Sequence, residues 1–234
     1  AAVSDLPDFQ KAAMGNGFLN EHVDWDQIVR RVPLIMKLGD KPVFSMVAET
    51  LRVVTGAHTY IARAAGANGE KSFGENTGLT AVRIGPLTIP TDAAGRVWVY
   101  YSKPRQDRRI SAAAILSGNF DPALVKDHIV LVGTSAAGVV NDLQATPIAA
   151  GVPGVEIHAQ LLEQILQGVY LARPDWGKGA EILFALVASI CLIIVLPRIG
   201  ALPSALFGAA AIVVGIAIPW LAFRRAHLLI DPVY

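Results

Sequence analysis

Charged residues are scarce in the last quarter of the sequence. Soluble domains carry roughly a quarter charged residues, whereas 17% of this 234-residue chain is charged. The deficit lies in residues 182–223, where Arg198 is the only formally charged side chain. The preceding residues have an ordinary globular composition, long enough for one domain with its own core. The net charge of +1 gives no electrostatic argument for nucleic acid as a partner.

The residue patterns of metal sites and catalytic centres are also missing. The one cysteine, Cys191, lies inside an apolar run, so an intrachain disulfide is excluded. The five histidines follow no metal-ligand spacing. No serine or cysteine lies in a nucleophile-elbow motif, and no motif pairs two carboxylates. We therefore expect no catalytic residue, metal or cofactor in this segment.

Two long apolar runs near the end of the chain predict a transmembrane hairpin. A spanning helix needs roughly 20 apolar residues, with a range of about 17–25, and residues 180–196 and 199–223 meet this requirement. Pro197, Arg198 and the stretch 200–203 break the pattern between them. Trp176 and Trp220 suit interfacial anchors. The alternative is a pair of buried helices in a soluble protein, which runs of this length argue against.

The preceding residues predict alternating helices and strands. We expect helices at 42–55, 111–117 and 153–167, with Gly56 and Gly168 ending the first and the last. Strands are expected at 79–90 and 96–101, joined by a turn at 91–95. The β-branched run at 128–133 is typical of a strand buried on both faces, as in a parallel or mixed sheet covered by helices. The fold class is therefore α/β, followed by the two-helix membrane hairpin.

A glycine-containing loop at 133–138 is the strongest candidate for a binding site. It lacks the lysine of a Walker loop and the three glycines of a dinucleotide motif. It is either a close-packed turn or a pocket at the end of the predicted strand, where α/β sheets bind ligands. In the second case Thr134, Ser135, Asp142 and His158 bind a small polar ligand. Otherwise Asp142 caps the loop and His158 is a structural hydrogen-bonding residue at a helix start.

Several motifs together resemble a known family, the CHASE type two sensory domain. The resemblance is carried by Ile129-Val-Leu-Val-Gly133-Thr-Ser-Ala-Ala-Gly138, Asn141-Asp142-Leu143, Thr146-Pro147 and Pro153-Gly154-Val155-Glu156-Ile157-His158-Ala159. Earlier similarities lie in residues 17–20, 24–33 and 89–96. The closing stretch 229–234 is similar to the link before the family's third membrane helix.

The resemblance implies a multi-pass receptor in the cytoplasmic (inner) membrane. Residues 1–175 would be the C-terminal part of an extracytoplasmic sensory domain, and 224–234 would link to a further helix. The family plan also implies that a first membrane helix, the first half of the sensory domain and an output module lie outside this sequence. It implies a homodimer in the lipid bilayer that binds an unidentified small molecule or peptide. The output would be a class III adenylate or guanylate cyclase; the alternatives are a histidine kinase, a Ser/Thr kinase or a dimerisation module without ligand.

The distribution of basic residues opposes this orientation. Arg173, Lys178, Arg224 and Arg225 flank one end of the predicted hairpin, and Arg198 lies at the other. Positive-inside counting would place the sensory domain in the cytoplasm. The rule is weaker for long translocated domains, so we follow the resemblance. The helix ending at Gln167 continues directly toward the first span and is the expected transmitter.

Overall fold

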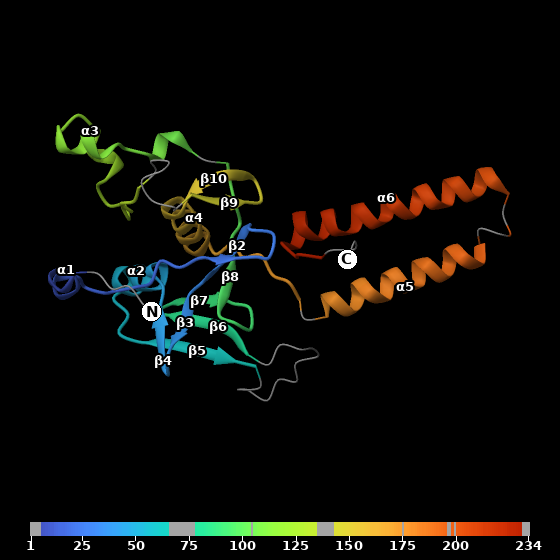
Figure 1. Cartoon of the computed structure of the whole chain (residues 1–234), viewed down its shortest axis with the longest axis horizontal. Coiled ribbons are helices and arrows are strands. Elements are labelled where there is room, and N and C mark those ends of the chain that lie inside the picture. The colour runs from blue at the N-terminus through green and yellow to red at the C-terminus, as the bar shows by residue number, and fades with distance from the viewer. Residues whose placement is uncertain are drawn as a thin grey trace. The chain divides into compact units, whose positions relative to one another are not determined.

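The computed structural model describes residues 6–65, 78–103, 105–134, 143–174, 176–195, 198 and 200–230. The chain divides into two compact units. The first comprises Ala1–Ala57 and Val99–Val169, and the second comprises His58–Trp98 and Tyr170–Tyr234. The mixture of helices and strands confirms the α/β class, and Figure 1 labels the elements.

Short antiparallel hairpins and two longer helices build the first unit. Its elements are α1 (Pro7–Ala12), β1 (His22–Val23), β2 (Val29–Pro33), β3 (Ile35–Leu38), β4 (Lys41–Phe44), α2 (Met46–Thr55), the 3-10 turns at Gln106–Arg108 and Pro122–Leu124, α3 (Ala112–Leu116), β9 (Leu143–Thr146), β10 (Ala149–Pro153) and α4 (Gly154–Gln167). The pairs β1–β2, β3–β4 and β9–β10 are antiparallel. Isolated bridges between Phe18 and Ser45 and between Ile28 and Ala145 are parallel, so the pairing is mixed.

Helix α2 begins later than the sequence predicts. The expected start at Pro42 is wrong because residues 41–44 form β4, paired with β3. Ser45 is the N-cap, and its hydroxyl accepts a hydrogen bond from the Ala48 amide at 3.2 Å. Gly56 ends the helix in the left-handed conformation at φ 65°, as expected.

Helix α4 supplies much of the buried surface of the first unit. Ile157, Leu161 and Ile165 are almost fully buried, and α4 contacts both α2 and β10. Burial of each such side chain stabilises the fold by about 1.5–3 kcal/mol. Gly168 ends the helix at φ 68°, which confirms the predicted stop. Leu166, expected on the core face, is instead 53% exposed.

The predicted strand at 128–133 is wrong. These residues have no strand structure, and Val130 and Val132 are 47% and 93% exposed. A β-branched run forms a strand only where another strand offers its backbone groups. No backbone hydrogen bond joins 129–134 to another described residue. Local composition therefore indicated a strand where the described chain provides no partner.

The second unit contains an antiparallel sheet and the helical hairpin. Its elements are β5 (Tyr60–Ala64), β6 (Leu79–Ile84), β7 (Leu87–Pro90), β8 (Arg96–Trp98), α5 (Gly177–Val195) and α6 (Ala201–Ala226). The order β5–β6–β7 is antiparallel throughout. The strand predicted at 79–90 is thus two strands, because Gly85 turns the chain at φ 54°. The predicted turn at 91–95 is confirmed, and Asp92 accepts from the amides of Ala94 and Arg96.

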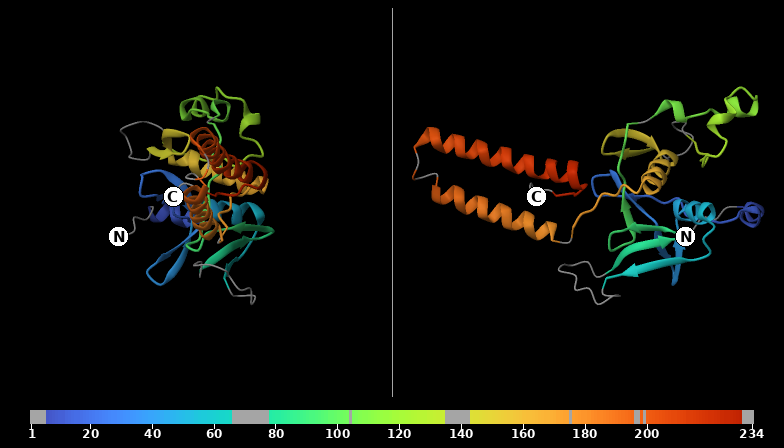
Figure 2. Two further views of the ribbon diagram at one scale, coloured as in Figure 1. Left: turned by 90° about the vertical axis from the view of Figure 1, so that its right-hand side faces the viewer. Right: turned by 180° about the vertical axis from the view of Figure 1, so that it is seen from behind.

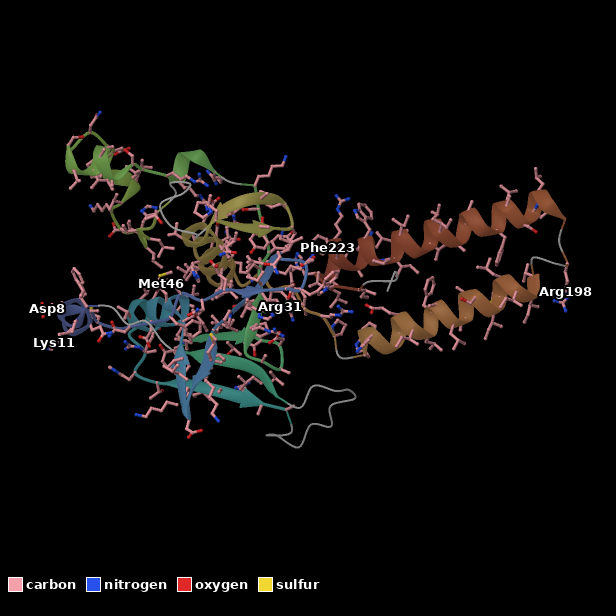
Figure 3. All side chains as sticks on the ribbon, in the orientation of Figure 1. Asp8, Lys11, Arg31, Met46, Arg198 and Phe223 are labelled. Carbon is pink, nitrogen blue, oxygen red and sulfur yellow. The ribbon has the colours of Figure 1, made fainter. Side chains whose placement is uncertain are left out.

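Helices α5 and α6 run side by side as the predicted hairpin (Figures 1 and 2). Both are long and apolar enough to cross a membrane. In the most apolar stretch of each helix, only 6% of α5 and 0% of α6 is buried against the rest of the protein. Core helices of a soluble protein would be mostly buried, so the exposure favours contact with lipid. Figure 3 shows Arg198 at the turn between the helices and Phe223 at the opposite end of α6. The predicted boundaries at 175 and 196 lie outside the described residues.

Candidate functional site

The structure describes two of the four sequence-predicted site residues, Thr134 and His158. Ser135 and Asp142 lie outside the described residues. Thr134 is exposed, while His158 is 2% exposed. Gly133, just before Thr134, lies so close to α4 that an added Cβ would meet the Val155 Cβ at 2.5 Å. This glycine allows a close approach, as a close-packed turn requires. The predicted ligand role of these residues stays a prediction.

His158 joins α4 to the segment before β1. Its Nε2 lies 3.2 Å from the Leu19 carbonyl oxygen and donates to it, because a carbonyl only accepts. The same nitrogen lies 3.9 Å from Glu21 Oε1. The two side chains are 3% and 7% exposed, so the pair is almost dry. This geometry agrees with the structural, hydrogen-bonding alternative for His158.

A second attachment of α4 comes from the segment after Val99. We define the α4 strap as residues 100–109, of which 104 is outside the described set. The amide of Tyr100 donates to Gln164 Oε1 at 2.6 Å, and that of Ser102 donates to Gln160 Oε1 at 2.9 Å. The two glutamines are four residues apart and therefore share one face of the helix.

Two ion pairs extend the strap along α4. Arg108 lies 2.6 Å from Glu163, and Arg109 pairs with Glu156. The hydrogen bond from Arg108 lowers the pKa of Glu163 below its ordinary value. Exposed pairs contribute little stability, about 0–1 kcal/mol each. They fix the register of the strap on the helix more than they stabilise the fold.

The segment after α4 forms a contact at the base of the helical hairpin. The Ala172 amide donates to the His227 carbonyl at 3.1 Å, and the Leu229 amide donates to the Ala172 carbonyl at 2.9 Å. Ala172 and Leu228 thus form a parallel bridge. The residues entering α5 are therefore bonded to the residues leaving α6. We call this contact the membrane-proximal clasp.

An ion pair completes the clasp. Arg173 Nη2 lies 3.0 Å from Glu181 Oε2, and the glutamate side chain is 4% exposed. A buried carboxylate that loses its partner destabilises a protein by up to about 3–5 kcal/mol. Arg173 itself is 34% exposed, which reduces this cost through solvent screening. On α6, the Arg224 guanidinium lies 5.3 Å from the centre of the Trp220 ring, which suits an interfacial anchor.

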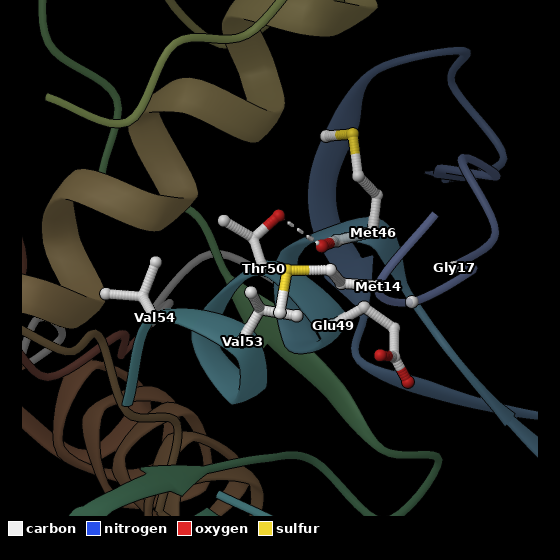
Figure 4. A pocket seen from close by; sticks show the side chains of 8 residues that line it. Met14, Gly17, Met46, Glu49, Thr50, Val53 and Val54 are labelled. Atoms are coloured by element: carbon white, nitrogen blue, oxygen red, sulfur yellow. Dashed lines mark hydrogen bonds between the residues drawn. The ribbon is translucent and has the colours of Figure 1, made fainter. Parts of the chain in front are cut away.

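An apolar pocket of about 260 Å³ lies beside α2 (Figure 4). Its lining is mainly apolar and includes Met14, Met46 and Val53, with the polar side chains of Glu49 and Thr50. The polar groups are engaged locally: Thr50 donates to the Met46 carbonyl, and Glu49 pairs with Arg52 at 2.8 Å. The pocket has room for a small apolar group and offers few polar contacts.

The strap, the clasp and the pocket were all missed by sequence reasoning. Gln160 and Gln164 gave the only usable signal, because two amides four apart beside apolar positions mark a polar contact on a helix face. The clasp joins the residues before α5 to the residues after α6, which are far apart in the sequence, so no local sequence pattern predicts it. Within the described residues, no group of three His, Cys, Asp or Glu side chains could hold a metal ion.

Comparison with known proteins adds one match. The family model of the CHASE2 domain matches residues 2–194, most of the chain. No curated protein and no solved structure matches.

Proposed function

The chain belongs to the CHASE2 domain family, extracellular sensory domains of signalling receptors, and we propose that it relays a signal across a membrane. In this proposal the residues before α5 receive an extracytoplasmic signal and the α5–α6 hairpin carries it to a cytoplasmic output domain. The clasp is the observation that supports this most directly. It bonds the segment that follows α4 to the first helix of the hairpin, through Glu181, and to the residues that follow α6.

The proposed relay starts at α4. This helix ends at Gly168, and the chain reaches the clasp at Ala172 within a few residues. A signal that changes how α4 is held must therefore act on the clasp through the connector 168–174. A ligand can transmit a signal to the hairpin only if it binds the two arrangements of α4 with different affinities. The His158 contact and the strap are the attachments on which that difference would act.

The proposed output is a class III adenylate or guanylate cyclase in the inner membrane. The support is the resemblance of the closing stretch 229–234 to the cyclase branch of the family. Because such cyclases work as dimers, the receptor is proposed to be a homodimer. A histidine kinase or Ser/Thr kinase output remains the alternative and would use the same relay.

The proposed orientation places the residues before α5 on the extracytoplasmic side of the membrane. Four basic residues lie at the clasp end of the hairpin, against Arg198 at its turn. Two of the four are engaged locally, since Arg173 pairs with Glu181 and Arg224 stacks on Trp220. The positive-inside rule is also weak for long translocated domains. Membership of the CHASE2 family therefore supports the proposed orientation.

The relay is tested by a flexible insertion in the connector. Gly-Ser-Gly placed between Gly168 and Val169 in the full-length receptor lets α4 move without moving the clasp. We expect basal output activity to change several-fold, because the sensory domain no longer biases the output.

The same insertion after Gly118 is the matched control. Gly118 ends a short turn at φ 71° with open space around it, so the extra residues are tolerated. This variant keeps the wild-type output. Equal outputs from the connector insertion and the wild type would refute the relay.

A further inference from the structure

One face of α6 carries an apolar groove that is followed by a basic side chain. The groove has a volume of about 390 Å³ and is lined by Val213, Ile216, Ala217 and Trp220. Because an α-helix has 3.6 residues per turn, these positions and Arg224 fall within roughly 100° of the helix circumference. The next turn of the same face therefore carries Arg224.

The groove is open to the surroundings of the helix. Val213 and Ile216 are 64% and 66% exposed, and Trp220 is 55% exposed. In the most apolar stretch of α6, none of the helix is buried against the rest of the protein. When α6 crosses a membrane, as proposed, lipid acyl chains are therefore the molecules that lie against this groove.

Trp220 and Arg224 mark the level of the lipid headgroups on this face. The Arg224 guanidinium lies 5.3 Å from the centre of the Trp220 ring. Tryptophan is enriched at membrane–water interfaces, and arginine near a helix end places its charge there. A guanidinium over a ring contacts it with its flat face, whereas its N–H donors lie along its edges. Those edges match the oxygens of a phosphate group, which arginine binds through two parallel hydrogen bonds.

The charge at this end of α6 favours an anionic headgroup. Arg224 and Arg225 occupy the last turn, both are exposed, and the helix contains no acidic side chain. On α5, the carboxylate of Glu181 belongs to the ion pair of the clasp and is 4% exposed. Asp175 and Asp231 lie outside the described residues. A zwitterionic headgroup carries its own cation beside the phosphate, whereas an anionic headgroup has its negative charge compensated by arginine.

We infer that this face of α6 binds an anionic phospholipid, with an acyl chain in the groove and the headgroup phosphate on Arg224. The site lies at the end of α6 that Phe223 marks in Figure 3. The clasp begins at the same end, where His227 and Leu229 bond to Ala172. A bound lipid therefore holds the part of α6 that leads into the clasp. The inference rests on the proposed membrane crossing and is independent of the relay and of the output domain.

Quenching of tryptophan fluorescence by brominated lipids tests the inference on the chain itself. The chain is placed in bilayers of equal parts phosphatidylglycerol and phosphatidylcholine, with bromine on the acyl chains of one lipid or the other. The signal of Trp220 is the difference between the wild-type chain and Trp220→Phe. We expect this signal to show about a fivefold preference for phosphatidylglycerol, the effect of one arginine near anionic lipid.

Arg224→Gln should remove the preference, so that the two brominated lipids quench Trp220 equally. Arg225→Gln is the matched control, because it removes the same charge at a position about 100° around the helix from Arg224. It should keep most of the preference. Both side chains are exposed, so both variants should fold as the wild type does. An equal loss in the two variants would mean that the helix end attracts lipid without a site, and would overturn the inference.

Equal quenching by the two lipids in the wild-type chain would also overturn the lipid site. It would leave the relay intact, because the relay is tested by the connector insertion.

A second fluorescent position separates the remaining outcomes. Phe184 on α5 is 38% exposed, and Phe184→Trp in the Trp220→Phe chain places a tryptophan there. If position 184 is quenched while Trp220 in the wild-type chain is not, protein covers the groove, as a second copy of the chain would, and the lipid site fails. If neither position is quenched, the hairpin is not in the bilayer, and both the lipid site and the proposed membrane relay fail.

Discussion

At the scale of single residues, a network of ion pairs fixes the turn before β2. Asp24 accepts from Arg30 at 3.2 Å and from Arg31, and Asp26 accepts from Arg30 at 2.7 Å. Burial raises the pKa of Asp24, but the hydrogen bonds from Arg31 and Arg30 outweigh it, so its pKa lies below the ordinary value. The ionised form of Asp24 is therefore more stable in the folded state than in the unfolded chain.

Replacing Asp24 with Asn should lower stability and weaken its pH dependence. A carboxylate with a depressed pKa stabilises the fold above its unfolded value of 3.8, and this contribution is lost as pH falls through the folded value. We expect the free energy of unfolding at pH 7 to fall by about 1–3 kcal/mol. Urea titrations of the chain in nanodiscs from pH 7 to pH 3 measure both effects.

Asp40→Asn serves as the control, because the Asp40 side chain is fully exposed beside Lys37. Its unfolding curves should match the wild type at each pH. An Asp24→Asn chain with wild-type stability and wild-type acid sensitivity would show that the network contributes nothing.

At the scale of elements, local residue chemistry predicted where helices end better than where they begin. Gly56 and Gly168 end α2 and α4 because each adopts the left-handed conformation that glycine tolerates. The predicted start of α2 was too early because residues 41–44 pair with β3, and no local sequence pattern predicts this contact. The run 128–133 has strand composition without a described strand partner. Strand pairing depends on contacts between distant segments, whereas the local sequence shows only the propensity of a segment to form a strand.

The strap prediction concerns Gln164. Gln164→Leu leaves the Tyr100 amide without its side-chain acceptor, which we expect to lower stability by about 1 kcal/mol. Exchange of the Tyr100 amide should become faster, and mass spectrometry of the exchanged chain reads this out.

Gln167→Leu makes the same change on the exposed part of the same helix. It removes a bond to Glu163 at 3.0 Å and should alter stability by less than about 0.5 kcal/mol. Unchanged exchange at Tyr100 in the Gln164→Leu chain would mean that the strap is not held by this residue.

At the scale of the whole molecule, the sequence predicted the family and the membrane hairpin but not the clasp at the base of the hairpin. Long runs of apolar residues are enough to predict a membrane-spanning helix. The motifs between residues 129 and 159 carry the family resemblance. The clasp depends on backbone atoms of Ala172, His227 and Leu229, whose side chains are unremarkable. The buried Glu21–His158 pair likewise joins residues that no spacing connects.

The most direct test of the account is the side of the membrane on which the first unit lies. Single cysteines at Ser117 and Gly200 in the full-length receptor, on a Cys191→Ala background, suit this test. Ser117 is exposed beyond α3, and Gly200 has open space at the hairpin turn. A membrane-impermeant thiol reagent applied to intact cells should label position 117 and not position 200. Labelling of position 200 and not 117 would place the sensory domain in the cytoplasm and contradict the account.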